Sequence, residues 1–160
     1  METIGFERHD HACCIQDGIA AVDAQCRDAG LQFTPVRRRV LEFLLAEHRA
    51  LGAYEILDML REEGLGSQPP VAYRALDFLV SNGFAHKIER LNAFAACSHP
   101  GTAHAPVFMI CRICASVAEA QADTPISMFG HLAKNAGFTI ERAVVEAEGV
   151  CPNCQDTSPT

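Results

Sequence analysis

The sequence lacks the features that would place it in or across a membrane. None of its apolar runs approaches the roughly 18 residues that a membrane-spanning helix needs. Its first residues, METIGFERHDHACC, carry acids and histidines where a signal peptide has cations and an apolar core. We therefore expect a soluble, cytoplasmic protein that has no membrane partner.

The chain also lacks a positive net charge. With 13 Lys and Arg against 20 Asp and Glu, its formal charge is -7, which argues against simple electrostatic coating of DNA or of an anionic membrane. Hydrophobic residues make up 49% and charged residues 21%, which excludes a disordered or a collagen-like chain. At 160 residues the chain is long enough to bury a core, and it just allows two small domains.

Cysteine, in contrast, is abundant: eight cysteines accompany seven histidines. Because a reducing cytoplasm disfavours disulfides, clustered cysteines indicate metal or redox chemistry. Four of these residues, His9, His11, Cys13 and Cys14, crowd the N-terminus. There we favour a flexible tail that binds metal only adventitiously over a designed site. Cys26 lies on a helical apolar stripe, and we predict that it is a core residue.

Three further helices are predicted from apolar spacing and from their end signals. One opens at Thr34, an N-cap residue followed by proline, and the others cover about 53–63 and 71–82. Two short β-like pieces, 85–90 and 93–97, follow and suit a hairpin. Helices followed by a hairpin are typical of a winged helix-turn-helix, although a generic helical domain with a hairpin fits the pattern almost as well.

The charge of this helical region gives a mixed answer about DNA. Between residues 27 and 90, nine Lys and Arg are balanced by nine Asp and Glu. Affinity for DNA would therefore depend on a local basic face and on specific contacts. The run Arg37, Arg38 and Arg39 is the best candidate for contacting phosphates, and a solvated helix edge explains it equally well.

A second, smaller domain is predicted after a segment rich in Pro, Gly and His, SHPGTAHAP. Short strands over 107–110 and 116–119 precede a helix over about 124–135 and a longer strand over 138–147. A β-α-β unit of about fifty residues has too small a core to be robust alone, so it needs a staple or a partner.

Two CxxC pairs can supply a cross-link that stabilises this small domain. Cys111 and Cys114 form the first pair, and Cys151 and Cys154 form the second after a gap of 36 residues. Four thiolates suit tetrahedral Zn²⁺, and four filled positions leave no open site for catalysis. A lone CxxC could be a redox pair, but two that bracket one small domain favour structural zinc.

A second set of metal ligands is less obvious. His86 and Cys97 lie on the predicted hairpin, His104 lies in the linker and Glu119 follows the first CxxC pair. Their N, S, N and O atoms make a plausible tetrahedral zinc site, which would be formally neutral when filled and which could fix how two domains are arranged. Spacing alone leaves His99 as a competitor of His104, and it leaves open that all of these are separate surface residues.

The runs PPVAYRALDFLVSNGFAHKIE, FMICRICASVAE and GVCPNC resemble the ferric uptake regulator family, and above all its zinc-sensing branch. The resemblance covers about residues 18–155, with the motifs in family order. It implies a dimeric, metal-dependent transcriptional repressor with a winged-helix N-terminal domain and an α/β dimerisation domain. Such a repressor binds inverted-repeat operators when its metal is present.

The resemblance also assigns residues. It makes Cys111, Cys114, Cys151 and Cys154 the structural zinc ligands, and it makes His86, Cys97, His104 and Glu119 the sensing site, which gives about two Zn²⁺ per chain. His104 is preferred to His99 because its distance to the first CxxC pair fits the family. Tyr54 and Arg74 fall where the family reads purines, and Tyr73 lies beside them. The family usually has PPTVYR where this chain has PPVAYR, so Val71 replaces a threonine that could cap the helix or contact phosphate.

We therefore predict an α+β chain with an N-terminal winged helix-turn-helix domain and a small C-terminal α/β dimerisation domain that holds a zinc knuckle pair. The predicted boundaries are a flexible tail over 1–16, the winged-helix domain over 17–97, a linker over 98–106, the dimerisation domain over 107–155 and a C-terminal tail over 156–160.

The predicted function is a zinc-responsive repressor of zinc-uptake genes that binds operator DNA as a homodimer. Three alternatives stay open at this point. The sensed metal could be iron, manganese or nickel. A zinc or thiol enzyme would need an open metal site or an activated nucleophile, and the Ser and His residues show no such arrangement. A zinc-stapled module that binds no DNA is disfavoured by the Tyr73-Arg74 pair at a helix start.

Overall fold

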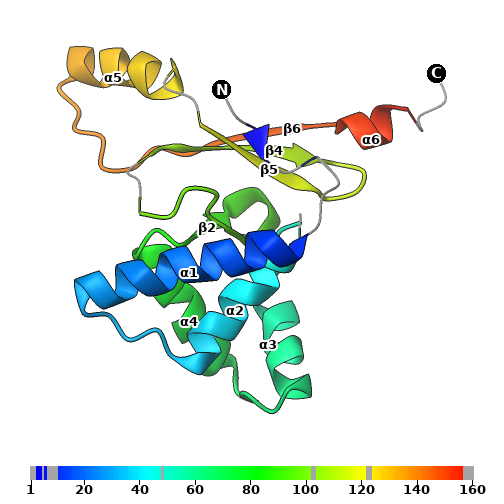
Figure 1. Cartoon of the computed structure of the whole chain (residues 1–160). Coiled ribbons are helices and arrows are strands. Elements are labelled where there is room, and N and C mark those ends of the chain that lie inside the picture. The colour runs from blue at the N-terminus through cyan, green and yellow to red at the C-terminus, as the bar shows by residue number, and fades with distance from the viewer. Residues whose placement is uncertain are drawn as a thin grey trace. The chain divides into compact units, whose positions relative to one another are not determined.

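The computed structural model describes residues 3–4, 6, 11–47, 49–101, 104–121 and 124–156. The chain divides into an N-terminal unit, residues 8–102, and a C-terminal unit that joins residues 1–7 to residues 103–160. Each unit has its own sheet, as the ribbon in Figure 1 shows. Among the described residues, no helix is long and apolar enough to cross a membrane.

The N-terminal unit is built on four helices. They are α1 (His11–Ala29), α2 (Pro35–Ala46), α3 (Ala53–Glu62) and α4 (Pro69–Ser81). Helix α2 begins where the sequence predicts, because the Thr34 hydroxyl accepts a hydrogen bond from the Arg37 amide at 3.3 Å and Pro35 occupies the first turn. Cys26 is 1% exposed in the core between these helices, as predicted.

A two-stranded wing follows the helices. Strands β2 (Ala85–Ile88) and β3 (Ala93–Ala96) pair antiparallel and are joined by a short 3₁₀ turn, η1 (Glu89–Leu91). Asn92 closes the turn with φ 46°, a left-handed conformation that asparagine tolerates well. Leu51 bridges to Phe94 of β3 through two 2.8 Å backbone hydrogen bonds and ties the wing to the helices. The predicted winged helix-turn-helix is confirmed.

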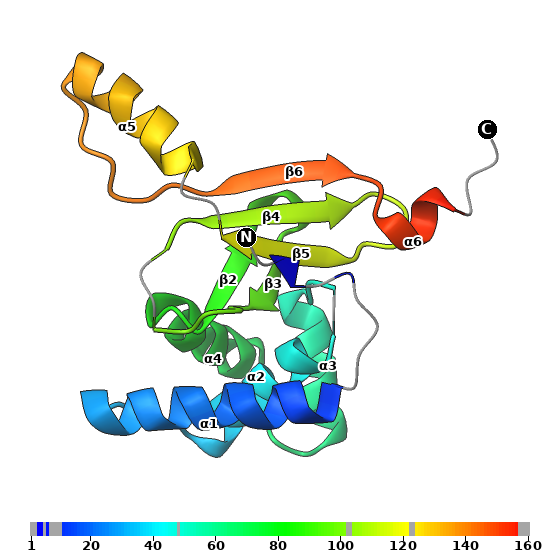
Figure 2. The same cartoon turned by 45° about the horizontal axis from the view of Figure 1, so that its top comes forward.

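The C-terminal unit is an α/β layer. Its strands are β1 (Thr3–Ile4), β4 (Pro106–Cys111), β5 (Val117–Gln121) and β6 (Val145–Gly149), and its helices are α5 (Thr124–Ala136) and α6 (Pro152–Gln155). The sheet order is β1-β5-β4-β6, with β4 antiparallel to β5 and parallel to β6. Figure 2 shows β4 flanked by these two strands.

Two predicted elements differ in the structure. The tail predicted over 1–16 contains strand β1, whose backbone pairs with the outer edge of β5, and the start of α1. Helix α1 begins early because Ile15 extends its apolar stripe by one turn and packs on the core. Cys13 and Cys14 lie in its first turn, where the Cys13 thiol donates to Asp17 at 3.5 Å, while His9 lies outside the described residues.

The long strand predicted over 138–147 is also wrong, since β6 starts only at Val145. Within the described sheet its partner is β4, whose first residue, Pro106, has no backbone N–H to donate. Among the described strands none pairs with residues 138–144, which therefore lie outside the sheet.

Candidate metal centres and nucleic-acid interface

Parallel pairing of β4 and β6 brings the two CxxC pairs to one end of the sheet. Cys111 ends β4 opposite Gly149 of β6, and Cys151 follows two residues later as the residue that caps α6. The first pair turns back tightly, because the Ala115 amide bonds to the Cys111 carbonyl at 3.0 Å and Ala115 adopts φ 61°. The predicted meeting of the two pairs therefore rests on the parallel pairing of β4 with β6.

The four sulfur atoms form a compact cluster. All lie within 4.8 Å of one another, none is in a disulfide, and Cys114 Sγ lies 3.7 Å from Cys151 Sγ. A tetrahedral zinc ion with sulfur ligands at about 2.3 Å requires neighbouring sulfurs about 3.8 Å apart. The donor set and its spacing therefore fit Zn²⁺, and Phe6 and Val150 pack against the buried side of the cluster.

Electrostatics in the cluster also favour a bound cation. Backbone N–H groups of Cys114 and then Cys151 point at Cys111 Sγ and lower the pKa of that thiol to about 6. The neighbouring Cys151 sulfur and burial raise the pKa of Cys154 to about 12. Without a cation, one thiol of the cluster deprotonates readily but the last one does so only with difficulty. A divalent metal stabilises all four thiolates.

The N-terminal unit holds one pair of the second predicted ligand set. His86 on β2 stands opposite Ala95, and the Cys97 amide bonds to Phe84 at 3.0 Å, so the two side chains are diagonal neighbours on one face of the wing. A ring nitrogen of His86 and Sγ of Cys97 lie within 4.8 Å. Cys97 is buried, and the competing histidine, His99, lies half-buried in the turn that follows.

The C-terminal unit holds the other pair. Nε2 of His104 lies 2.8 Å from Oε1 of Glu119 on β5. Their side chains are only 12% and 5% exposed, and Glu119 is the one buried charged residue among those described. An imidazole and a carboxylate held this closely in a shielded place are typical zinc ligands.

The predicted base-reading residues lie on exposed helix surfaces. Tyr54 on α3 is 66% exposed and Tyr73 on α4 is 43% exposed, while the core-facing side of α4 is buried. Arg74 is exposed, and within the described part of the chain no hydrogen bond or ion pair engages its guanidinium. The five N–H donors of the Arg74 guanidinium are thus available for an external partner.

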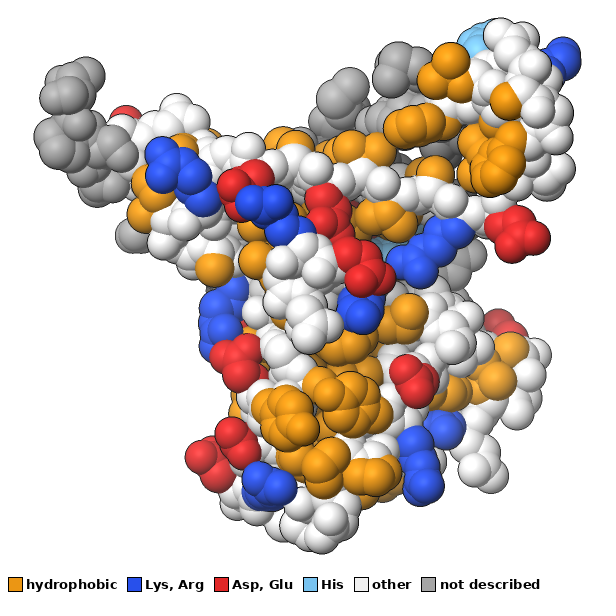
Figure 3. Space-filling view, turned by 180° about the vertical axis from the view of Figure 1, so that it is seen from behind, with side chains coloured by type: hydrophobic (Ala, Val, Ile, Leu, Met, Phe, Trp, Pro, Cys, Tyr) orange, Lys and Arg blue, Asp and Glu red, His pale blue; other side chains and the backbone are white. Residues whose placement is uncertain are grey.

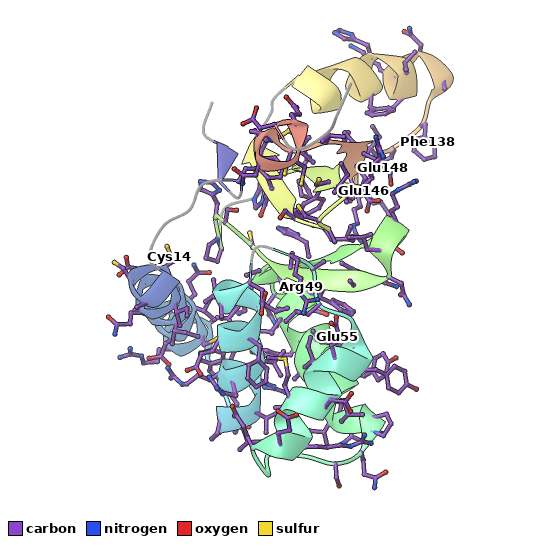
Figure 4. The ribbon with its side chains drawn as sticks, turned by 90° about the vertical axis from the view of Figure 1, so that its right-hand side faces the viewer. Cys14, Arg49, Glu55, Phe138, Glu146 and Glu148 are labelled. Carbon is purple, nitrogen blue, oxygen red and sulfur yellow. The ribbon has the colours of Figure 1, made fainter. Side chains whose placement is uncertain are left out.

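The start of α3, where Tyr54 lies, is held by a contact that the sequence analysis did not predict. Glu55 accepts a hydrogen bond from the Gly52 amide at 2.9 Å and another from Arg49 at 2.9 Å, which caps the start of α3 (Figure 4). The Gly52 amide and then Arg49 hold the pKa of Glu55 below its usual range. The glutamate three residues after Gly52 is a signal from which this cap could have been predicted.

The arginine run is held by contacts within the N-terminal unit. Arg37 stacks on Phe78 of α4, 3.9 Å from the ring centroid, and also donates to a backbone carbonyl. Arg38 pairs with Asp23 at 3.2 Å, and Arg39 pairs with Glu42 and Glu63. Stacking uses the face of the Arg37 guanidinium and leaves donors on its edge for another acceptor. The stacking of Arg37 and the ion pair of Arg38 both restrict these side chains before any partner binds.

The departure PPVAYR does not remove a helix cap. Helix α4 begins at Pro69 after the cap residue Gln68, so Val71 is its third residue and not its cap. Val71 is half-buried against the core, and Ala72 is 1% exposed. The replacement of threonine therefore affects packing and any phosphate contact at this position, not the start of the helix.

An apolar face lies on the C-terminal unit. Phe129 and Leu132 of α5 and Phe138 after it are 42%, 62% and 67% exposed. They line a cavity of about 520 Å³ with the segment that leads to β6 (Figure 3, upper right). β6 is also the last strand of the described sheet on that side. An apolar patch beside an open strand edge is the kind of surface that a second subunit covers.

The chain was compared with known proteins. No protein-family model matches it. It is 35% identical to the zinc uptake regulation protein of Escherichia coli K12 over 140 residues, which is 87% of this chain and 82% of that protein. A zinc uptake regulator complexed with zinc and DNA matches with a TM-score of 0.86 and 34% identity, over 89% of this chain and 96% of that one. Holo XcZur matches with a TM-score of 0.81 and 40% identity, over 88% and 98%.

The winged helix-turn-helix, the α/β unit and the four-cysteine cluster together define a metalloregulator of the ferric uptake regulator class. Identity of 35% over most of both chains narrows the class further. The chain belongs to the zinc uptake regulator family.

Proposed function

We propose that the protein is a zinc-responsive transcriptional repressor, which binds inverted-repeat operators of zinc-uptake genes as a homodimer when zinc is bound. The observation that carries this proposal is the His86–Cys97 pair. These donor groups lie on the wing that directly follows the exposed helix α4, so metal ligands are built into the DNA-binding unit itself. The relative bound to zinc and DNA supports the same conclusion.

The sensing step joins two pairs of ligands. His86 and Cys97 supply a nitrogen and a thiolate, while His104 and Glu119 supply a nitrogen and a carboxylate. One thiolate and one carboxylate balance the charge of Zn²⁺, whereas the empty site gains nothing from bringing its anions together. Zinc binding thus favours one arrangement of the two units. Zinc can shift the equilibrium toward the DNA-binding arrangement only by as much as it binds that arrangement more tightly than the others.

The second zinc has a structural role. The four-cysteine cluster closes the end of the small β-sheet in the C-terminal unit, where Cys111, Cys151 and Cys154 are buried. Its four protein ligands leave no position for substrate, which argues against catalysis at this ion. With about two Zn²⁺ per chain, one ion maintains the unit and the other reports zinc availability. Nothing in this arrangement requires enzymatic activity.

DNA recognition is assigned to α3 and α4. Arg74 reads guanine through its guanidinium, and Tyr54 and Tyr73 also contact bases, because all three are exposed and a helix can enter the major groove. The stacked Arg37 and the paired Arg38 contact phosphates and set the register. Since the helical region has no net charge, affinity comes from these contacts and from having two reading units per dimer.

The dimer contact is assigned to the C-terminal unit. A second copy covers the exposed Phe129, Leu132 and Phe138, which a lone subunit would leave in water. A two-fold dimer presents two reading helices in opposite directions, which explains the preference for inverted repeats. A repressor acts on the chromosome, so its place is the cytoplasm.

A soft thiolate in the sensing site favours zinc over iron or manganese, which leaves a sensor of another metal as the second candidate. Operator binding measured against buffered free Zn²⁺, with Mn²⁺ and Fe²⁺ as controls, separates them. We expect binding to appear with zinc at far lower free concentrations than with the other metals. Equal or better activation by Mn²⁺ or Fe²⁺ would contradict the assignment.

A further inference from the structure

Helix α1 holds the segment that leaves the wing. Nε2 of Gln25 donates a half-buried hydrogen bond to the carbonyl oxygen of Pro100 at 2.8 Å. The next residue, Gly101, has φ +83°, and a Cβ atom built there would lie 2.3 Å from Oε1 of Gln25. Only glycine allows both this backbone conformation and this close approach. The Gln25 amide and the Pro100-Gly101 peptide therefore fit each other closely.

This contact lies on the segment between two proposed zinc ligands. Cys97 is already fixed, since it is buried and its amide bonds to Phe84. The Gln25 hydrogen bond fixes Pro100 three residues later, and His104 follows three residues after Gly101. Most of the chain between Cys97 and His104 is thus anchored to the N-terminal unit.

We propose that Gln25 is a positioning residue for the sensing site: it sets the course of the linker and thereby the free zinc concentration at which the protein responds. This inference rests on the proposed function. A metal ion that binds both Cys97 and His104 must restrict the chain between them, which costs conformational entropy. A linker that is restricted beforehand binds metal more tightly, because less freedom is lost on binding.

The test is Gln25→Ala in the full chain, with operator binding titrated against buffered free Zn²⁺. The zinc midpoint should move about five-fold higher, which is the effect of one ordinary hydrogen bond. Operator affinity at saturating zinc and the content of cysteine-bound zinc should stay as in the parent. Gln16→Ala is the matched control, because Gln16 is an exposed glutamine on the same helix.

A second variant tests the contact from its other side. Gly101→Ala places a methyl group against the Gln25 amide and should raise the zinc midpoint in the same direction. In the double variant the shifts should not add, because removing the Gln25 side chain makes room for the methyl group. Additive shifts would contradict a direct interaction between these residues.

The outcomes separate the two claims. A parent chain whose operator binding ignores zinc would overturn the proposed function, and this inference with it. A zinc-responsive parent with an unchanged midpoint in Gln25→Ala would overturn the inference alone. Equal losses of thermal stability and of operator affinity at saturating zinc would assign Gln25 a merely structural role and would also overturn it.

Discussion

His104 and Glu119 hold each other in the C-terminal unit, with Nε2 and Oε1 2.8 Å apart. Burial of a carboxyl group is costly unless a hydrogen bond satisfies it, and the contact with His104 supplies one. An imidazole nitrogen and a carboxylate oxygen are also atoms to which zinc binds in proteins. Half of the proposed sensing site therefore already holds two of its donor atoms close together.

Glu119→Gln tests this pair. The amide keeps the size of the side chain and can still bond to His104, but it is a poor zinc ligand and leaves the filled site with an extra positive charge. Sensing-site affinity for zinc should fall at least about ten-fold, since even outer groups around a metal change affinity by that much. Chelator competition measures it, and Glu141→Gln, an exposed site in the same unit, is the control. Unchanged affinity would remove Glu119 from the site.

Cys111→Ser tests the structural cluster. The change removes one thiolate from a set of four whose sulfurs all lie within 4.8 Å. We expect loss of the cysteine-bound zinc together with loss of the dimer, because the cluster ties the ends of β4 and β6 together in a unit that is too small to be robust alone. Zinc content and sedimentation velocity measure the two effects. Cys26→Ser, a buried cysteine in the N-terminal unit, should keep both. A folded dimer of Cys111→Ser with full zinc content would rule out the structural role.

Arg74→Ala tests base reading. A bidentate arginine–guanine contact gives about 1–3 kcal/mol of discrimination, so affinity for the operator should fall by that amount while affinity for random DNA changes much less. Arg27→Ala is the control, because Arg27 is an exposed arginine at the end of α1 that pairs with Asp23. Equal losses on both DNAs would show that Arg74 contacts phosphate instead.

Glu55 predicts a pH-dependent contribution to stability. Its lowered pKa means that ionised Glu55 stabilises the fold above the usual carboxyl pKa, and that this contribution disappears as pH falls through the lowered value. Near pH 7, Glu55→Gln should lower the free energy of unfolding by about 1 kcal/mol or less, since the side chain is half exposed. The difference should shrink as pH falls below the usual carboxyl pKa of about 4.3 and should vanish below the lowered pKa.

Denaturant unfolding of the parent and of Glu55→Gln across this pH range measures the effect. Glu62→Gln serves as the control, because Glu62 is an exposed glutamate near the end of the same helix. A difference between parent and Glu55→Gln that stays constant from about pH 3, roughly one unit below the usual carboxyl pKa, up to about pH 7 would show that the ionised carboxylate does not cap α3.

The sequence predicts well those parts of the fold that local chemistry determines. Thr34 followed by proline starts a helix, and two CxxC pairs on neighbouring strands meet because the sheet forces them to. Long-range contacts carry no such local signal. Nothing near Gln25 in the sequence shows that Pro100 lies against it, and the start of β6 depends on where its partner β4 begins.

The central claim is that one zinc maintains the fold and a second controls DNA binding, and Cys97→Ser tests it most directly. Cys97 offers the only sulfur of the proposed sensing site, apart from the four-cysteine cluster. Equilibrium dialysis, sizing and operator binding on one sample should show a folded dimer whose zinc content falls from about two to about one per chain. Its operator binding should no longer respond to zinc. A variant that keeps two zinc ions and binds DNA in a normal zinc-dependent way would contradict the account.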